Sequence, residues 1–154
     1  MSDASESREQ RTVKETPRES EKRFRLLLEN MEDMVSRHLP DSTIIYVSPS
    51  CRPMLGYAPE ELVNTRAADY VHPDDVLATL ATIDEAIAEH GGHYRVQHRM
   101  KRKNGGYVWV ETTGRLLYGT DGRLLEIQCV VRDITARKRA EKDLLAWKNR
   151  YASA

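Results

Sequence analysis

The chain has 154 residues, of which 40% are hydrophobic and 31% are charged, and its 24 basic residues balance its 24 acidic ones. This length fits one domain with extensions, and a net charge of zero gives no support for a nucleic-acid or anionic-membrane partner. No stretch reaches the roughly 18–20 apolar residues that span a bilayer, and the polar N-terminus has no apolar signal-peptide core. We therefore expect a cytoplasmic protein whose two cysteines, Cys51 and Cys129, are reduced.

The first third of the chain predicts a tail, a helix and a hairpin. Residues 1–19 are polar without apolar periodicity, which predicts a disordered tail. A short amphipathic helix follows, with Ser20 as its cap. Its apolar stripe consists of Phe24, Leu27, Leu28 and Met31. Two strands, Met34–His38 and Thr43–Val47, are expected on either side of a turn at residues 40–42.

Helical signals fill the middle of the chain. Gly56 interrupts a short helix, and Pro59 begins the next one. The clearest helix runs from Pro73 to about Glu89. Its apolar stripe consists of Val76, Leu80, Ile83 and Ile87. We expect the pair Gly91-Gly92 to end this helix in a left-handed conformation.

Three strands follow, at Tyr94–Lys101, Tyr107–Leu117 and Leu124–Arg132, separated by Asn-Gly and Asp-Gly turns. Apolar residues alternate with polar ones along the first and last of them, which is typical of a sheet covered on one side. The predicted inner residues are Tyr94, Val96, His98, Met100, Leu125, Ile127, Cys129 and Val131. The fold class is therefore α+β, with a five-stranded antiparallel sheet, short helices over one face, and flanking N-terminal and C-terminal helices.

From Thr135 onward the apolar period becomes helical. Ala140, Leu144, Trp147 and Tyr151 form a heptad seam of roughly two heptads, typical of the start of a coiled coil. A segment this short is marginal as an isolated coiled coil.

Four motifs in order resemble a PAS domain with its C-terminal PAC segment, in the subgroup common in bacterial sensors. They read YVSPSCRPMLGYAPEELV, YVHPDDV, YRVQHRMKRKNGGYVWVE and GRLLEIQCVVRDITARKRAE. The resemblance covers about residues 21–140 and assigns residues 20–136 to the domain and 137–154 to the start of a signalling helix. It implies a curved sheet that sometimes encloses a ligand cavity. It also implies a signal-transduction role as a sensory or dimerisation module, whose last helix acts on an effector such as the histidine kinase of a two-component system or a cyclic-di-nucleotide enzyme.

The resemblance and the residue pattern together predict three sets of site residues. Signal transmission is assigned to Asp133, Ile134 and Thr135, with Thr135 as the cap of the last helix and Asp133 near its positive end. The expected cavity lining is Tyr46, His98, Met100, Trp109, Ile127 and Cys129. The apolar stripe of the first helix, together with Leu144, Trp147 and Tyr151, is expected to pair in a homodimer.

The sequence offers residues for and against haem, flavin and metal binding. His98 could ligate haem, or it could be an ordinary core histidine, and the helix at residues 76–89 offers no histidine of its own. In the blue-light flavin branch of the resembled family a cysteine stands where this chain has Ala67, which argues against a flavin–cysteine adduct. The loose spacing of Glu89, His90, His93 and His98 argues against a metal site.

No constellation of catalytic residues is recognisable, so we expect a protein that is not an enzyme. The leading interpretation is a sensory and dimerisation module. The alternatives are a sensor loaded with haem, flavin or a metabolite, and a protein-binding adaptor with an empty core.

Overall fold

The computed structural model describes residues 16–29 and 31–152, so most of the predicted polar tail lies outside the described residues. Five strands form one antiparallel sheet in the order β2-β1-β5-β4-β3. The strands are β1 (Met34–His38), β2 (Ile44–Val47), β3 (His93–Lys101), β4 (Tyr107–Tyr118) and β5 (Leu124–Asp133). The predicted fold class and the strand positions are confirmed, with strand ends shifted by one residue.

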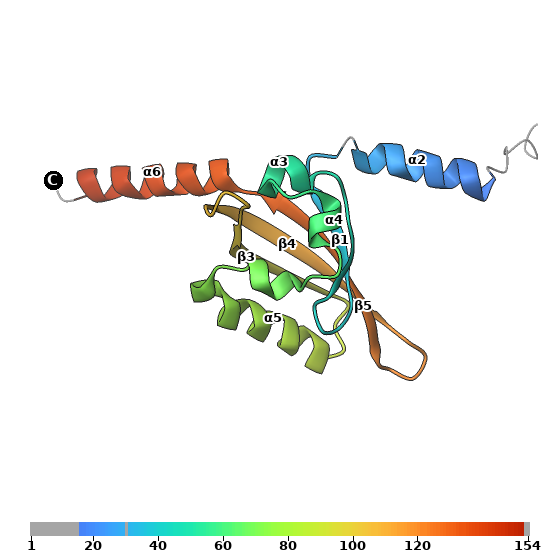
Figure 1. Ribbon diagram of the computed structural model, residues 1–154. Coiled ribbons are helices and arrows are strands. Elements are labelled where there is room, and N and C mark those ends of the chain that lie inside the picture. The colour runs from blue at the N-terminus through green and yellow to red at the C-terminus, as the bar shows by residue number, and fades with distance from the viewer. Residues whose placement is uncertain (1–15, 30, 153–154) are drawn as a thin grey trace, which may run out of the picture.

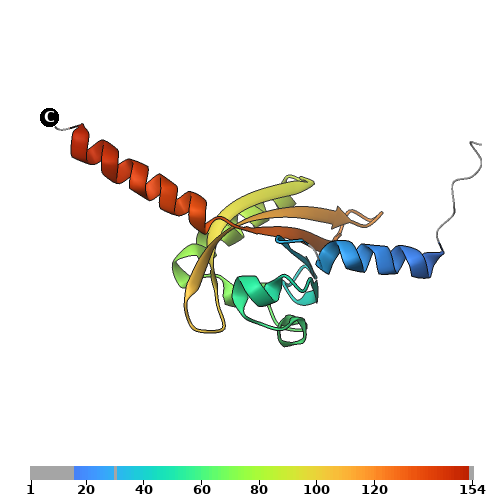
Figure 2. The same ribbon diagram turned by 90° about the horizontal axis from the view of Figure 1, so that it is seen from above.

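Helices cover one face of this sheet, as Figure 1 shows for α5. They are α3 (Cys51–Leu55), α4 (Pro59–Leu62) and α5 (Val76–Ala88), with two 3₁₀ turns, η1 (Ala67–Tyr70) and η2 (Pro73–Asp75). The flanking helices α2 (Pro17–Glu29) and α6 (Thr135–Tyr151) extend away from the body in opposite directions (Figures 1 and 2). No helix within residues 16–29 and 31–152 combines the length and hydropathy that a bilayer span requires.

The start of α2 corrects two predictions. The helix begins at Pro17, so residues 17–19 are helical rather than part of a disordered tail. Its cap is Thr16 and not Ser20: the Glu19 N–H donates to Thr16 Oγ1 over 3.3 Å, and the Thr16 N–H donates to Glu19 Oε2 over 3.1 Å. This reciprocal pair is a capping box, and proline suits the first helical position that follows it. Met31 lies beyond the end of α2.

The end of the predicted long helix also differs from expectation. Its first turn, η2, is a 3₁₀ turn, and α5 ends at Ala88. The residue with a left-handed backbone is His90, with a φ of 50°, and neither Gly91 nor Gly92 has a positive φ. The Gly91 N–H instead donates to the Ala86 carbonyl over 2.8 Å, which closes the helix end. The predicted break at Gly56 is confirmed, because this residue ends α3 with a φ of 83°.

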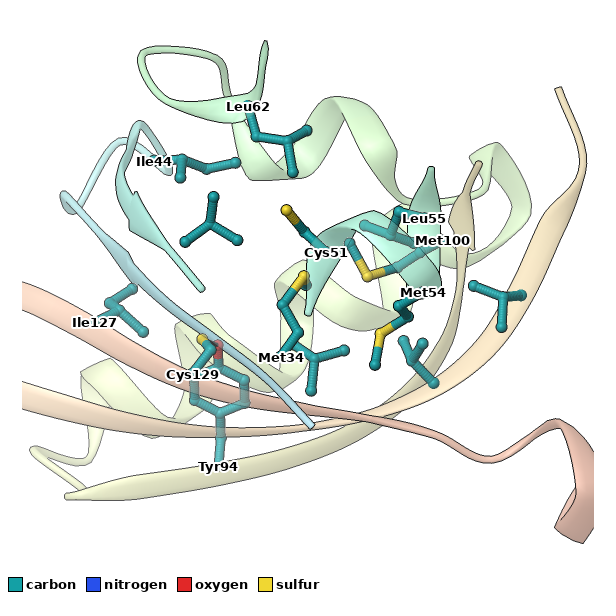
Figure 3. Close-up of a cluster of buried hydrophobic side chains, with 14 of the residues drawn as sticks. Met34, Ile44, Cys51, Met54, Leu55, Leu62, Tyr94, Met100, Ile127 and Cys129 are labelled. Carbon is teal, nitrogen blue, oxygen red and sulfur yellow. Dashed lines mark hydrogen bonds between the residues drawn. The ribbon is translucent and has the colours of Figure 1, made fainter. Parts of the chain in front are cut away.

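The hydrophobic core lies between the inner sheet face and the helices that cover it (Figure 3). Leu125 was expected there but is 57% exposed. The β4–β5 pairing shifts between Leu117 and Tyr118, so that Tyr118 pairs with Leu124, which packs against the core in place of Leu125. A bulge of this kind exchanges the faces of the residues beyond it, because strand side chains alternate.

Candidate functional site

A cavity of about 160 Å³ lies between the inner sheet face and the helices. Its walls are mostly apolar and come from β1, β2, β3, β5, α3 and α5. Representative wall residues are Met34, Ile44, Leu55, Ile83, Tyr94 and Ile127. Figure 3 shows several of these side chains packed around the space between the sheet and the helices.

Four of the six residues predicted to line a cavity lie on its wall: His98, Met100, Ile127 and Cys129. Trp109 does not, because its neighbours Val108 and Val110 are buried on the inner face and strand alternation turns Trp109 to the outer face. Tyr46 lies on a groove between α2 and the outer sheet face. Helix α5 also contributes to the wall, including Thr79, and this contribution was not predicted from the sequence. The spacing of Thr79, Ile83 and Ile87 on one helix face is the signal that could have indicated it.

Two buried polar atoms in this wall have no hydrogen-bond partner among the described residues. His98 is only 4% exposed, and its Nε2 lies 2.9 Å from Thr112 Oγ1, while its Nδ1 is unpaired. Burial holds the pKa of His98 below its usual value, so its imidazole is neutral near pH 7. Thr79 is 7% exposed, and its Oγ1 is also unpaired.

Cys129 is the centre of a second polar group on the wall. The Tyr94 hydroxyl lies 3.3 Å from Cys129 Sγ, and His38 Nδ1 lies 4.0 Å from the same sulfur (Tyr94 and Cys129 are labelled in Figure 3). Burial raises the pKa of Cys129 to about 11 and lowers the pKa of His38 to about 4. Thiol and imidazole are therefore both neutral near pH 7, and the thiol is a poor nucleophile.

Cys51 is also free and buried. Its Sγ donates to the Tyr57 carbonyl over 3.3 Å, and burial raises its pKa to about 11.

The residues of this cavity do not fit haem or flavin. Pockets for drug-sized ligands measure roughly 300–1,000 Å³, and this cavity is smaller at about 160 Å³. Ala67 lies on the wall without a thiol, and His98 Nε2 already faces Thr112. A thioether and thiol environment with two unpaired polar atoms suits a much smaller molecule.

The junction between β5 and α6 is held by hydrogen bonds from two backbone N–H groups. The Thr135 N–H donates to Asp133 Oδ1 over 2.8 Å, so Asp133 provides the capping oxygen and Thr135 is the first helical residue rather than the cap. Ile134 between them is 2% exposed, and its N–H donates to the Trp109 carbonyl over 2.9 Å. The junction is thereby attached to β4.

Side chains of the first turn of α6 add contacts to the outer face of the sheet. Lys138 Nζ lies 4.6 Å from the Trp109 ring centroid, and Arg137 Nη1 lies 3.5 Å from Glu111 Oε2. These contacts are half-exposed, so each contributes about 0.5–1 kcal/mol at most. From Arg139 onward, the side chains of α6 are exposed.

Arg99 connects the same tryptophan to the start of α5. Its guanidinium makes two hydrogen bonds of 2.9 Å to the Asp75 carboxylate, and its backbone N–H donates to Asp75 Oδ2 over 2.9 Å. The Arg99 Cζ atom lies 5.2 Å from the Trp109 ring centroid. The hydrogen bonds from Arg99 lower the pKa of Asp75 to about 2. Asp75, Arg99, Trp109 and Lys138 thus form a continuous row of contacts from α5 to α6.

These features define a small α+β domain with an apolar internal cavity and a long outgoing helix. The PAS fold family matches residues 44–131, which is more than half of the chain. The chain belongs to the PAS fold family, and it is a sensory PAS domain that resembles those of signalling proteins.

Individual relatives and structures agree with this assignment. White collar 2 protein of Neurospora crassa is 37% identical over 90 residues, covering 57% of this chain and 16% of that protein. Two-component sensor PprA of Pseudomonas aeruginosa is 29% identical over 126 residues, covering 82% of this chain and 14% of that protein. The chain therefore spans less than a fifth of the length of these curated relatives.

Among solved structures, a sensory box histidine kinase/response regulator from Burkholderia thailandensis superposes with a TM-score of 0.70 at 24% identity. The match covers 86% of this chain and 99% of that one. An RNA-binding light-oxygen-voltage receptor superposes with a TM-score of 0.72 at 17% identity, covering 90% of this chain and 40% of the other. At these identities the structural matches establish the shared fold.

Proposed function

We propose that this chain is a non-catalytic sensory and dimerisation module that relays the state of its cavity through α6 to an effector such as a histidine kinase. The observation that carries the proposal is the row of contacts formed by Asp75, Arg99, Trp109 and Lys138. This row joins the helix that walls the cavity to the first turn of the outgoing helix.

The relay begins at α5. Val76, Leu80 and Ile83 from this helix line the cavity, and Asp75 directly precedes it. A ligand that binds one position of α5 better than another shifts the population of the two positions. Because Asp75 holds the Arg99 guanidinium by two hydrogen bonds, movement of α5 changes the contact between Arg99 and Trp109.

The relay ends at the β5–α6 junction. The first turn of α6 contacts the domain through Arg137 and Lys138, and Ile134, which directly precedes the helix, bonds to β4. The direction of the remaining helix therefore depends on a few contacts, and small changes at Trp109 are carried to its far end by a 17-residue helix.

The flanking helices supply the proposed dimer contact. Phe24 and Leu27 on α2 are 60% and 59% exposed, and Trp147 and Tyr151 on α6 are 59% and 58% exposed. Exposed apolar stripes of this kind are typical of association surfaces, and a two-fold dimer buries the same stripe of both copies. Leu144 adds to the α6 stripe at 53% exposure, whereas Met31 is 39% exposed outside the helix and the side chain of Leu28 lies outside the described part.

Removal of residues 1–31 tests the dimer. We expect the full chain to have the mass of a dimer by light scattering and the truncated chain to dissociate at the same concentration. Replacement of Arg18 by Ala is the matched control, because it changes an exposed residue of α2 outside the apolar stripe. Equal masses for the full and truncated chains would reject a role for α2 in dimerisation.

The proposed role of the β5–α6 junction is tested by measuring the direction of α6 relative to the domain. Nitroxide labels at Arg123→Cys and Lys148→Cys report the distance between the β4–β5 turn and α6, with labelled protein diluted in unlabelled protein. Asp133→Ala removes the oxygen that accepts from the Thr135 N–H, so we expect a broader distance distribution. Asp133→Asn retains an acceptor oxygen and is the control. An identical narrow distribution in Asp133→Ala would contradict the proposed role of this junction.

A further inference from the structure

The cavity wall is almost uncharged, which disfavours the binding of charged ligands. Among the described residues that form it, there is no lysine, arginine or glutamate, and the one aspartate, Asp84, is exposed. The two wall histidines, His38 and His98, have pKa values lowered by burial and are neutral near pH 7. An ionised ligand would therefore enter without a counter-charge in a largely apolar space, which is unfavourable.

Two polar atoms of the described cavity wall lack a hydrogen-bond partner. His98 Nδ1 and Thr79 Oγ1 are both buried, and no atom in the described part of the chain pairs with them, although buried polar atoms are nearly always hydrogen-bonded. The residues come from different elements, β3 and α5, and both line the cavity. A hydroxyl or N–H group on a bound molecule would supply the missing hydrogen bond.

The volume of the cavity and the sulfur atoms on its wall restrict the class of ligand further. An apolar protein cavity of about 150 Å³ binds benzene, and the volume here is about 160 Å³. The thioethers of Met34 and Met100 and the thiol of Cys129 lie on the wall, and sulfur contacts the edges of aromatic rings favourably. The wall therefore favours one aromatic ring over a branched or extended chain.

We propose that the cavity binds a small, neutral, single-ring aromatic molecule whose hydroxyl or N–H group pairs with His98 Nδ1, Thr79 Oγ1 or both. This inference rests on the proposed sensory function and names the chemical class of its ligand. Leu80 and Asp84 on α5 and Pro40 before β2 are exposed wall residues, which places the entrance between α5 and the β1–β2 turn.

Calorimetric titration of the full chain with phenol, toluene and benzoate tests the proposal. In a cavity without polar partners, phenol loses the hydration of its hydroxyl and binds at least about tenfold more weakly than toluene. We expect phenol to bind at least as tightly as toluene, and benzoate to bind at least about tenfold more weakly than phenol. Tighter binding of toluene than phenol, or equal binding of benzoate, would overturn the proposal, and so would the failure of both neutral probes to bind.

Two variants locate the polar partner. Thr79→Val keeps the side-chain shape and removes Oγ1, and His98→Phe keeps a ring and removes Nδ1. We expect the affinity of phenol relative to toluene to fall about threefold to tenfold in at least one of them. Thr82→Val is the control, because Thr82 lies on the same helix outside the cavity wall and its hydroxyl donates to the Ala78 carbonyl. An unchanged ratio in both variants would contradict the assignment.

The calorimetric result is independent of the proposed relay. Phenol binding without a change in the spin-label distance to α6 would support the ligand class and contradict the relay. A broader distance distribution in Asp133→Ala, with no binding of phenol or toluene to the parent chain, would support the junction and overturn the ligand class alone.

Discussion

Replacement of Gly114 by alanine should destabilise the domain, because Tyr94 occupies the space where a side chain would stand. Tyr94 on β3 pairs with Gly114 on β4, and Gly114 pairs with Cys129 on β5. The tyrosine ring crosses above Gly114, and its hydroxyl reaches Cys129 Sγ at 3.3 Å. A Cβ atom at position 114 would lie 2.0 Å from Tyr94 Cε1 and 2.2 Å from Tyr94 Cζ.

The magnitude follows from two losses. Overpacking of a core site costs about 1–3 kcal/mol, and loss of the hydrogen bond to Cys129 costs about 0.5–1.5 kcal/mol. We expect Gly114→Ala to lower the free energy of unfolding by about 2–4 kcal/mol. At about 2–4 °C per kcal/mol for a chain of this size, the melting temperature falls by roughly 10 °C.

Urea and thermal unfolding followed by circular dichroism measure this effect. Gly92→Ala is the matched control, because its Cβ would meet nothing within 4 Å, and we expect unchanged or slightly higher stability. In a Tyr94→Ala background the clash is absent, so Gly114→Ala should cost less than about 0.5 kcal/mol. A Gly114→Ala variant as stable as the parent, or an equal cost in both backgrounds, would refute this account of the Tyr94 site.

Two further predictions concern ionisable groups. The pKa of Asp75 is lowered to about 2 from 3.8 by Arg99, so its contribution to stability is present above pH 3.8 and is lost as the pH falls towards 2. Asp75→Asn should lower the free energy of unfolding by about 1–3 kcal/mol at pH 7. In urea titrations, the difference in unfolding free energy between the parent and Asp75→Asn should become smaller between pH 4 and 2. A difference that does not depend on pH would contradict the lowered pKa of Asp75. The pKa values of Cys51 and Cys129 are both raised to about 11. Ellman's reagent should therefore modify the two thiols slowly at pH 8 in the folded chain and rapidly in urea. Rapid modification of the folded chain would refute the burial of these thiols.

Local patterns in the sequence were sufficient for the sheet, because strands and tight turns have short-range signals. Gly105 and Gly122, in the two hairpin turns, have φ values of 91° and 80°. The Asn-Gly and Asp-Gly pairs in the sequence indicate such positive φ values. The exposed position of Leu125 could not be predicted in this way, since it depends on a bulge in the pairing of two strands. The cap at Thr16 was a local signal that was available but was assigned instead to Ser20.

The cavity was predictable only on its sheet side. Alternation along β3 places His98 and Met100 inward, and the same rule applied to β4 would have placed Trp109 outward. The contribution of Thr79 depends on how α5 lies across the sheet, which is a matter of tertiary packing. Strand parity therefore defines one wall of such a site, whereas the opposite wall requires the structure.

One strand brings the cavity and the contact to α6 close together. His98 and Met100 on β3 line the cavity, and Arg99 between them lies on the other face against Trp109. The Arg99 N–H and C=O also bond to Asp75 and His72, which cover the open edge of the sheet at the start of α5. A shift of register by one residue would exchange these faces, so that His98 and Met100 would leave the cavity wall and Arg99 would leave Trp109. The proposed relay therefore needs no long path through the core, because a single residue at the sheet edge contacts the cavity helix and the tryptophan beneath α6.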